Sequence, residues 1–114
     1  MRAEDRIRLL HMVEAAQAAL KFVDGRQQSD LQTDQMLLFA VVRAIEIMGE
    51  ATNKVSKDVQ TANSNIPWRA IVGMRNRLIH AYFDVDTEMV WNTLQNEIPS
   101  LLNDLKALLD ENPG

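Results

Sequence analysis

Length, composition and charge narrow the class of protein to which this chain can belong. Its 114 residues, of which 46% are hydrophobic and 25% charged, fit one folded domain spanning residues 1–114. The sequence has no cysteine, which excludes disulfides and thiolate metal sites. No apolar run approaches the ~18 residues of a membrane helix, and the N-terminus is charged, unlike a signal peptide. We therefore expect a cytoplasmic protein that does not enter a membrane.

The charged residues are unevenly distributed along the chain. The net charge of −4 argues against a general nucleic-acid coat, which would usually be basic. Residues 59–83, however, contain no acidic residue and hold Arg69, Arg75, Arg77 and His80. Two interpretations stay open on this observation alone: the acidic residues fell elsewhere by chance, or the segment forms a local anion site on an acidic body.

Hydrophobic residues recur at intervals of three and four along the chain, which predicts helices throughout. The first helix is expected over about Glu4–Val23, and the Asp24-Gly25 pair should end it because glycine accepts the left-handed cap. A capping box at Ser29 and Gln32, or a cap at Thr33, should begin a second long helix. That helix is expected to run to roughly Val55.

The second helix is apolar almost all round from Met36 to Met48, which is typical of a central helix surrounded by others. One polar stripe interrupts it, formed by Arg43, Glu46, Glu50 and Lys54. We favour a ladder of surface ion pairs as its explanation, since such pairs are common at this spacing. The alternative is that the stripe faces a subunit interface or the active site.

The remaining chain predicts two more long helices. Ser56–Ile66 should be a loop with room for one helical turn, and Pro67 suits the first position of a new helix that fades near Tyr82. Asp86 is a suitable N-cap for the last helix, which Pro99 should kink or break. The sequence therefore predicts an all-α bundle of four long helices, with a possible short helix and a kinked C-terminal helix.

Histidine is the first residue type to consider for catalysis, and the chain has only His11 and His80. Two histidines far apart, without cysteine or an HExxH spacing, do not predict a metal site. No glycine-rich phosphate loop occurs, and no cofactor is expected. His11 falls on the charged side of the first helix and is expected to be plain surface.

His80 closes a different kind of segment, because it follows Arg75, Asn76 and Arg77 and precedes Tyr82 by two residues. A histidine moves protons near neutral pH, and an arginine stabilises the charge of a phosphate, so RNA could be cleaved here without a metal. Arg77 is expected to contact an RNA phosphate. The alternative is that Arg75 and His80 only interact with the C-terminal dipole of their helix.

Arg75 and His80 must act on the same phosphate, but an ideal helix places them on different faces. Positions five apart on an ideal helix lie about 140° apart, so Arg75 and His80 do not share a face, whereas Asn76 and His80 do. The groups can converge if the helix distorts near His80 or if a second subunit faces this segment. A composite site in a homodimer is the simpler of these explanations.

The segment from Arg75 to Tyr82, Arg-Asn-Arg-Leu-Ile-His-Ala-Tyr, fits the RX4HXY motif and resembles HepT-like HEPN ribonuclease toxins. Residues 43–51, 66–68 and 82–86 look like other recurring segments of that family. The length and the order of helices match as well, so the similarity spans nearly the whole chain.

This resemblance implies a specific function. HEPN bundles dimerise with their motif segments facing each other, so Arg75 and His80 would be the ribonuclease pair and Asn76 its polar neighbour. The chain would be the toxin of a HEPN/MNT toxin–antitoxin system. Its partner would be a nucleotidyltransferase antitoxin, similar to MntA, that transfers AMP from ATP onto Tyr82. The alternative within the same family is a non-catalytic helical subunit that binds such a nucleotidyltransferase.

Overall fold

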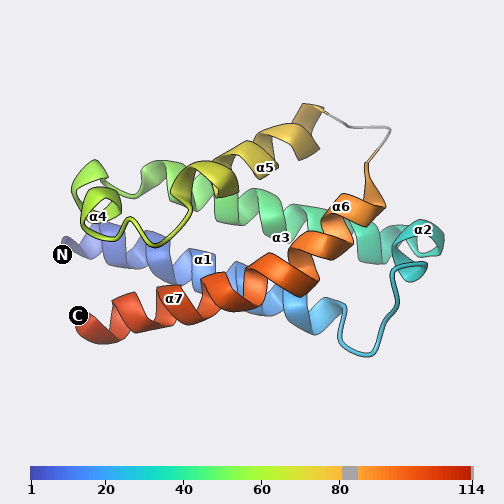
Figure 1. Ribbon diagram of the computed structural model, residues 1–114, viewed down its shortest axis with the longest axis horizontal. Coiled ribbons are helices and arrows are strands. Elements are labelled where there is room, and N and C mark those ends of the chain that lie inside the picture. The colour runs from blue at the N-terminus through green and yellow to red at the C-terminus, as the bar shows by residue number, and fades with distance from the viewer. Residues whose placement is uncertain (81–84, 114) are drawn as a thin grey trace.

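The computed structural model describes residues 1–80 and 85–113, with the backbone alone at Ile79 and His80. These residues contain no strand, and the predicted all-α class is confirmed. The helices are α1 (Ala3–Phe22), α2 (Asp30–Thr33), α3 (Gln35–Lys54), α4 (Lys57–Ala62), α5 (Trp68–His80), α6 (Thr87–Asn92), the π-helix η1 (Thr93–Glu97) and α7 (Ile98–Glu111). Since α6, η1 and α7 follow one another directly, they form one long rod beside α1, α3 and α5 (Figure 1).

The first helix forms as its hydrophobic spacing predicts. Leu9, Val13 and Ala16 are buried on one side of α1, which packs against both α3 and α7. The chain leaves α1 through Gly25, whose φ of 71° lies in the left-handed region. Glycine adopts this conformation without the steric cost of a Cβ, so the predicted stop signal is confirmed.

The predicted capping box is wrong, because another residue begins the second long helix. Ser29 has a helical backbone and precedes only the four-residue α2, and its side chain makes no cap hydrogen bond. Asp34 is the N-cap of α3: its backbone is extended, and its Oδ1 accepts a hydrogen bond of 3.1 Å from the Leu37 N–H. This hydrogen bond is the main reason that the pKa of Asp34 lies below its ordinary value, and a hydrogen bond from Arg26 lowers the pKa further.

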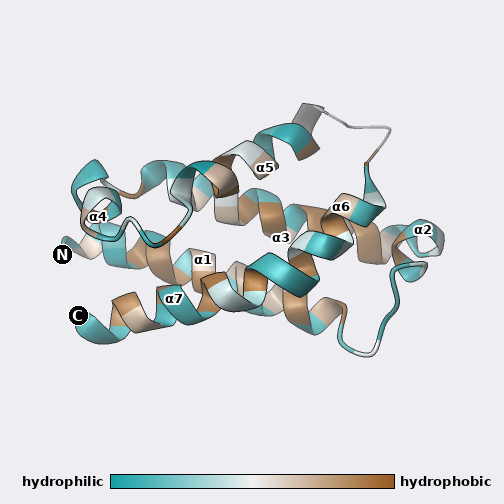
Figure 2. Ribbon diagram, in the orientation of Figure 1, coloured by the Kyte–Doolittle hydropathy of each residue, from teal (hydrophilic) through white to brown (hydrophobic). Residues whose placement is uncertain are grey.

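Helix α3 occupies the middle of the bundle, and Val41, Ile45 and Met48 are completely buried. Its N-terminal half is hydrophobic over much of its surface (Figure 2). The expectation that other helices surround it there is wrong for the described residues, because Met36 and Phe39 keep 83% and 61% of their surface exposed. Helices α1 and α5 pack against other faces of α3 and leave this face uncovered.

The polar segment after α3 contains the expected helical turn, which is the six-residue α4. Ser56 caps it, accepting a hydrogen bond from the Val59 N–H through its side chain. Asp5 of α1 is buried and accepts hydrogen bonds of 2.8 Å from both the backbone N–H and the hydroxyl of Ser56. The beginning of α1 therefore holds the start of α4 in place.

The C-terminal rod is distorted before Pro99 and is not broken there. Proline has no N–H, and its ring crowds the carbonyl four residues earlier, so the regular α-helical pattern cannot pass through this position. The chain responds by widening into the π-helix η1 over Thr93–Glu97, and α7 continues from Ile98. Among the described residues, no helix has both the length and the apolarity that crossing a membrane requires.

Candidate functional site

Helix α5 carries the basic segment and presents it on the outside of the bundle. Trp68, Met74 and Leu78 are buried in the core, which leaves Asn76 and Arg77 exposed on the outer side. Pro67 lies one residue before the helix, not at its first position, and its carbonyl accepts a hydrogen bond of 3.1 Å from the Ile71 N–H. Because these hydrophobic residues of α5 face the core, its polar residues lie on the outer side.

Arg75 lies at a tight contact between α5 and α3. A Cβ atom built on Gly49 would stand 2.3 Å from Cβ of Arg75 and 2.6 Å from its Cγ, distances that real side chains do not reach. The absence of a side chain at Gly49 therefore lets the aliphatic stem of Arg75 pack directly on the backbone of α3. This contact joins the motif helix to the central helix of the bundle.

The guanidinium of Arg75 has few partners among the described residues. Its Nη1 donates a hydrogen bond of 3.1 Å to Oδ1 of Asn76, the next residue on the same helix. Within the part of the chain that the structure describes, its buried Nε has no hydrogen-bond partner, and no carboxylate pairs with the guanidinium. Since no carboxylate of the described residues occupies the guanidinium, its charged end is suited to bind an anion.

Three residues of the polar stripe on α3, Arg43, Glu46 and Glu50, form the surface ion pairs that we favoured, whereas Lys54 pairs with no carboxylate of the described residues. Nη1 of Arg43 lies 3.2 Å from a carboxylate oxygen of Glu46 and 3.3 Å from one of Glu50. The hydrogen bond with Glu46 and the charge of Glu50 raise the pKa of Arg43. Both carboxylates belong to residues close to Gly49 in sequence, and both are engaged by Arg43.

The same stripe also borders a hollow between α3 and the end of α5. This pocket measures about 240 Å³ and is lined by Phe39, Val42, Arg43, Glu46, Leu78 and Val85. Leu78 lies two residues before His80, so the pocket adjoins the end of the motif helix. The stripe is therefore both a surface ion-pair ladder and a neighbour of the candidate site.

The structure brings together only part of the predicted site. Arg75 and Asn76 are in contact, Arg77 is exposed beside them, and His80 is the last residue of α5. The side chain of His80 and the whole of Tyr82 lie outside the described residues, so their approach to Arg75 stays a prediction. His11 is exposed on α1, as expected.

Gly49 is a residue at this site to which the sequence analysis gave no role. The available signal was a glycine in the interior of a long helix, which lowers helix stability and therefore often has a packing reason. Its neighbour across the contact could not be identified, because that neighbour lies 26 positions further along the chain.

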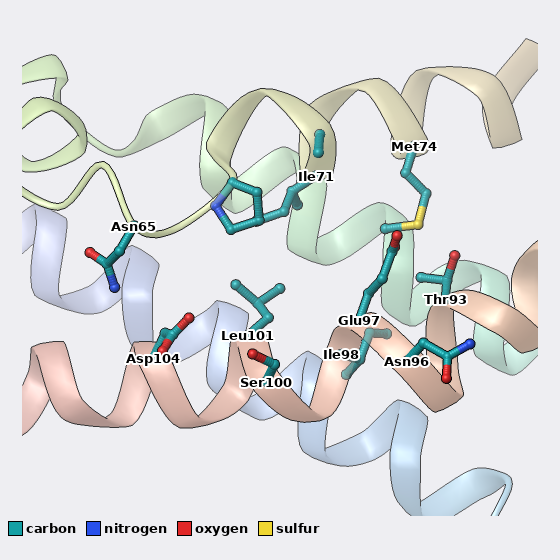
Figure 3. Close-up of a pocket in the computed structure, with 12 residues that line it drawn as sticks. Asn65, Ile71, Met74, Thr93, Asn96, Glu97, Ile98, Ser100, Leu101 and Asp104 are labelled. Carbon is teal, nitrogen blue, oxygen red and sulfur yellow. The ribbon is translucent and has the colours of Figure 1, made fainter.

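A second hollow lies beside the first half of α5 and has a different character. It measures about 320 Å³ and separates Ile71 and Met74 of α5 from the C-terminal rod. Figure 3 shows Met74 and Glu97 pointing toward each other across it. Among the described residues that line it, Glu97 and Asp104 are acidic and none is basic, so it does not suit an RNA phosphate.

The described part of the chain contains no group of three or more His, Cys, Asp or Glu side chains that could hold a metal ion.

The helical order and the motif helix define an all-α protein of the HEPN type. The model of the family described as "Ribonuclease HepT-like" matches residues 12–108, and the chain belongs to this family.

The names of similar curated proteins agree with membership of this family. A protein of Thermococcus cleftensis named "Probable ribonuclease HepT" is 43% identical over 79 residues, which cover 69% of this chain and 72% of that protein. A protein of Caldanaerobacter subterraneus subsp. tengcongensis, named as a candidate RNase, is 36% identical over 103 residues, or 90% of this chain and 92% of that one. No solved structure matches the chain.

Proposed function

We propose that this protein is the toxin of a HEPN/MNT toxin–antitoxin pair, acting in the cytoplasm as a metal-independent endoribonuclease. The family and the names of its relatives support ribonuclease chemistry. The single observation that carries the proposal is the guanidinium of Arg75, which lies on the motif helix and pairs with no carboxylate of the described residues.

The proposed reaction uses the ribose 2′-hydroxyl of the RNA as its nucleophile. His80 removes the proton from this hydroxyl, and the 2′-oxygen forms a bond to the adjacent phosphorus while the bond from phosphorus to the 5′-oxygen breaks. The departing 5′-oxygen takes up a proton. The products are a 2′,3′-cyclic phosphate and a 5′-hydroxyl, and no metal-bound water takes part.

The neighbouring residues have separate roles in this proposal. Arg75 donates hydrogen bonds to the non-bridging phosphate oxygens, whose charge grows in the transition state. Asn76 orients the guanidinium by accepting from Nη1. Arg77 is exposed beside them and contacts a neighbouring phosphate of the same RNA strand.

We further propose that two copies of the chain form the site. Met36 and Phe39 expose a hydrophobic surface on α3, and Phe39 also lines the pocket at the end of α5. Covering this surface with a second copy would remove it from water and bring a second motif helix to the same place. A facing subunit would also overcome the angular separation of Arg75 and His80 on one helix.

Regulation is proposed to act through Tyr82. The partner nucleotidyltransferase transfers AMP from ATP, so that the Tyr82 phenol oxygen bonds to the α-phosphorus and pyrophosphate leaves. The added phosphodiester charge would pair with Arg75 and Arg77, and the nucleoside would occupy space that RNA needs.

The proposal is tested by incubating RNA with the purified chain in the presence of a metal chelator. We expect cleavage with 2′,3′-cyclic phosphate ends, lost in His80→Ala and retained in the matched control His11→Ala. Loss of the general acid–base group should lower the rate by about 10²–10⁴. Full cleavage by a folded His80→Ala variant would falsify the ribonuclease mechanism and favour the non-catalytic subunit.

A further inference from the structure

We propose that Gly49 is a positioning residue for Arg75, because it sets how closely α5 approaches α3 and thereby where the guanidinium stands. The catalytic consequence rests on the proposed ribonuclease function. The positional claim rests on the contact between the two helices alone. The two parts can therefore be tested separately.

The geometry of the contact shows why the position is sensitive. The atoms that a Cβ on Gly49 would meet are Cβ and Cγ of Arg75, at 2.3 and 2.6 Å, followed by Cδ at 3.3 Å. The Cβ of Arg75 is attached to the α5 backbone and cannot rotate away from the collision. A larger residue at position 49 must therefore displace α5 itself, or the part of it that carries Arg75.

The other described contacts of Arg75 do not tie its guanidinium to the rest of the bundle. The hydrogen bond from Nη1 goes to Asn76, which belongs to the same helix and would move with it. The buried Nε has no partner on α3 or elsewhere in the described chain. The packing of the aliphatic stem on Gly49 is thus the contact that places the charged group relative to α3.

A matched control lies on α5 itself. A Cβ added to Gly73 would meet no atom within 4 Å. Gly49→Ala and Gly73→Ala make the same chemical change inside a helix, and both remove the conformational cost of a helical glycine. They differ in whether the new methyl group collides with Arg75.

The first experiment follows the Arg75 Nε–H signal by ¹⁵N NMR together with RNA cleavage. The wild-type signal should exchange slowly with water because Nε is buried, and Gly73→Ala should retain both its shift and its protection. Gly49→Ala should change the shift or lose the protection, and cleavage should fall by roughly 10²-fold, the cost of a misplaced group. An unchanged signal in Gly49→Ala, or a changed signal with wild-type cleavage, would overturn the proposal.

A second experiment applies even if Gly49→Ala folds poorly. Arg75→Gly removes the Cβ and Cγ atoms with which the new methyl group collides. Gly49→Ala should therefore lower the melting temperature in the wild-type background and leave it unchanged or raised in the Arg75→Gly background. Equal losses in both backgrounds would show that Gly49 does not act through Arg75. If the wild type fails to cleave RNA, the proposed function fails, while the melting and NMR comparisons still decide the positional claim.

Discussion

We expect Arg75 to lower the free energy of unfolding of the protein. Its Nε is buried and has no hydrogen-bond partner among the described residues, and a buried donor left unsatisfied costs about 1–3 kcal/mol. Arg75→Met keeps an aliphatic stem against Gly49 and places a methyl group where Nε stands. The exposed hydrogen bond from Nη1 to Asn76 is lost at the same time, which offsets part of the gain.

The net effect of Arg75→Met should be a rise of about 1 kcal/mol in the free energy of unfolding. For a domain of this size, that corresponds to roughly 4 °C in melting temperature. Cleavage of RNA should be lost because the guanidinium is gone. A more stable protein without activity is therefore the expected result.

Arg75→Lys provides the control for charge. Lysine has a methylene group at the position of Nε, so it also removes the unsatisfied donor, and it keeps a positive charge at its end. We expect at least wild-type stability together with strongly reduced cleavage, since a lysine lacks the planar set of donors. Both variants are tested by measuring thermal unfolding, urea unfolding and RNA cleavage on the same preparations. A loss of more than about 1 kcal/mol in both would show that Nε has a stabilising partner and would refute the reasoning.

Three further outcomes test other parts of the proposal. Incubation with the cognate nucleotidyltransferase and ATP should add AMP to the wild type and not to Tyr82→Phe, which intact mass spectrometry measures. An AMP adduct on Tyr82→Phe would show that another residue is modified. In light scattering, the wild type should be a dimer and Phe39→Glu a monomer. Phe22→Glu, a control at another exposed phenylalanine, should remain a dimer. A wild-type monomer with full activity would reject the composite site. Asp34→Ala should lower the melting temperature at neutral pH. The folded-state pKa of Asp34 is depressed, so its stabilising effect is present above the unfolded pKa of about 4 and is lost as the pH falls through the folded-state pKa. A difference in melting temperature that does not shrink between pH 5 and pH 2 would contradict the capping role.

The helices themselves follow from local patterns in the sequence. Leu9, Val13 and Ala16 repeat at helical spacing, and Gly25 ends the helix that they define. Local spacing is sufficient here, because a helix buries whichever side its hydrophobic residues share. The polar segment of the candidate site is predictable for the same reason, since Arg75 to His80 are neighbours in the chain.

Local patterns cannot decide between residues that are equally suited to one role. Ser29, Thr33 and Asp34 are all good helix caps by type, and the extended backbone of Asp34 decides which of them begins α3. In the same way, hydrophobic residues on every side of α3 predicted a surrounded helix. The packing of α1 and α5 leaves Met36 and Phe39 exposed instead.

The environment of Arg75 is decided only by tertiary structure. The sequence places an arginine on a helix and a glycine on another, 26 positions apart, and nothing in either segment indicates that they touch. Packing of α5 on α3 brings the Arg75 stem onto Gly49, and Nε is buried without an acceptor from residues 1–78 or 85–113. The sequence alone therefore determined which residues could bind a phosphate. The distance between two helices decided where the guanidinium stands and which of its donors has no partner in the described part of the chain.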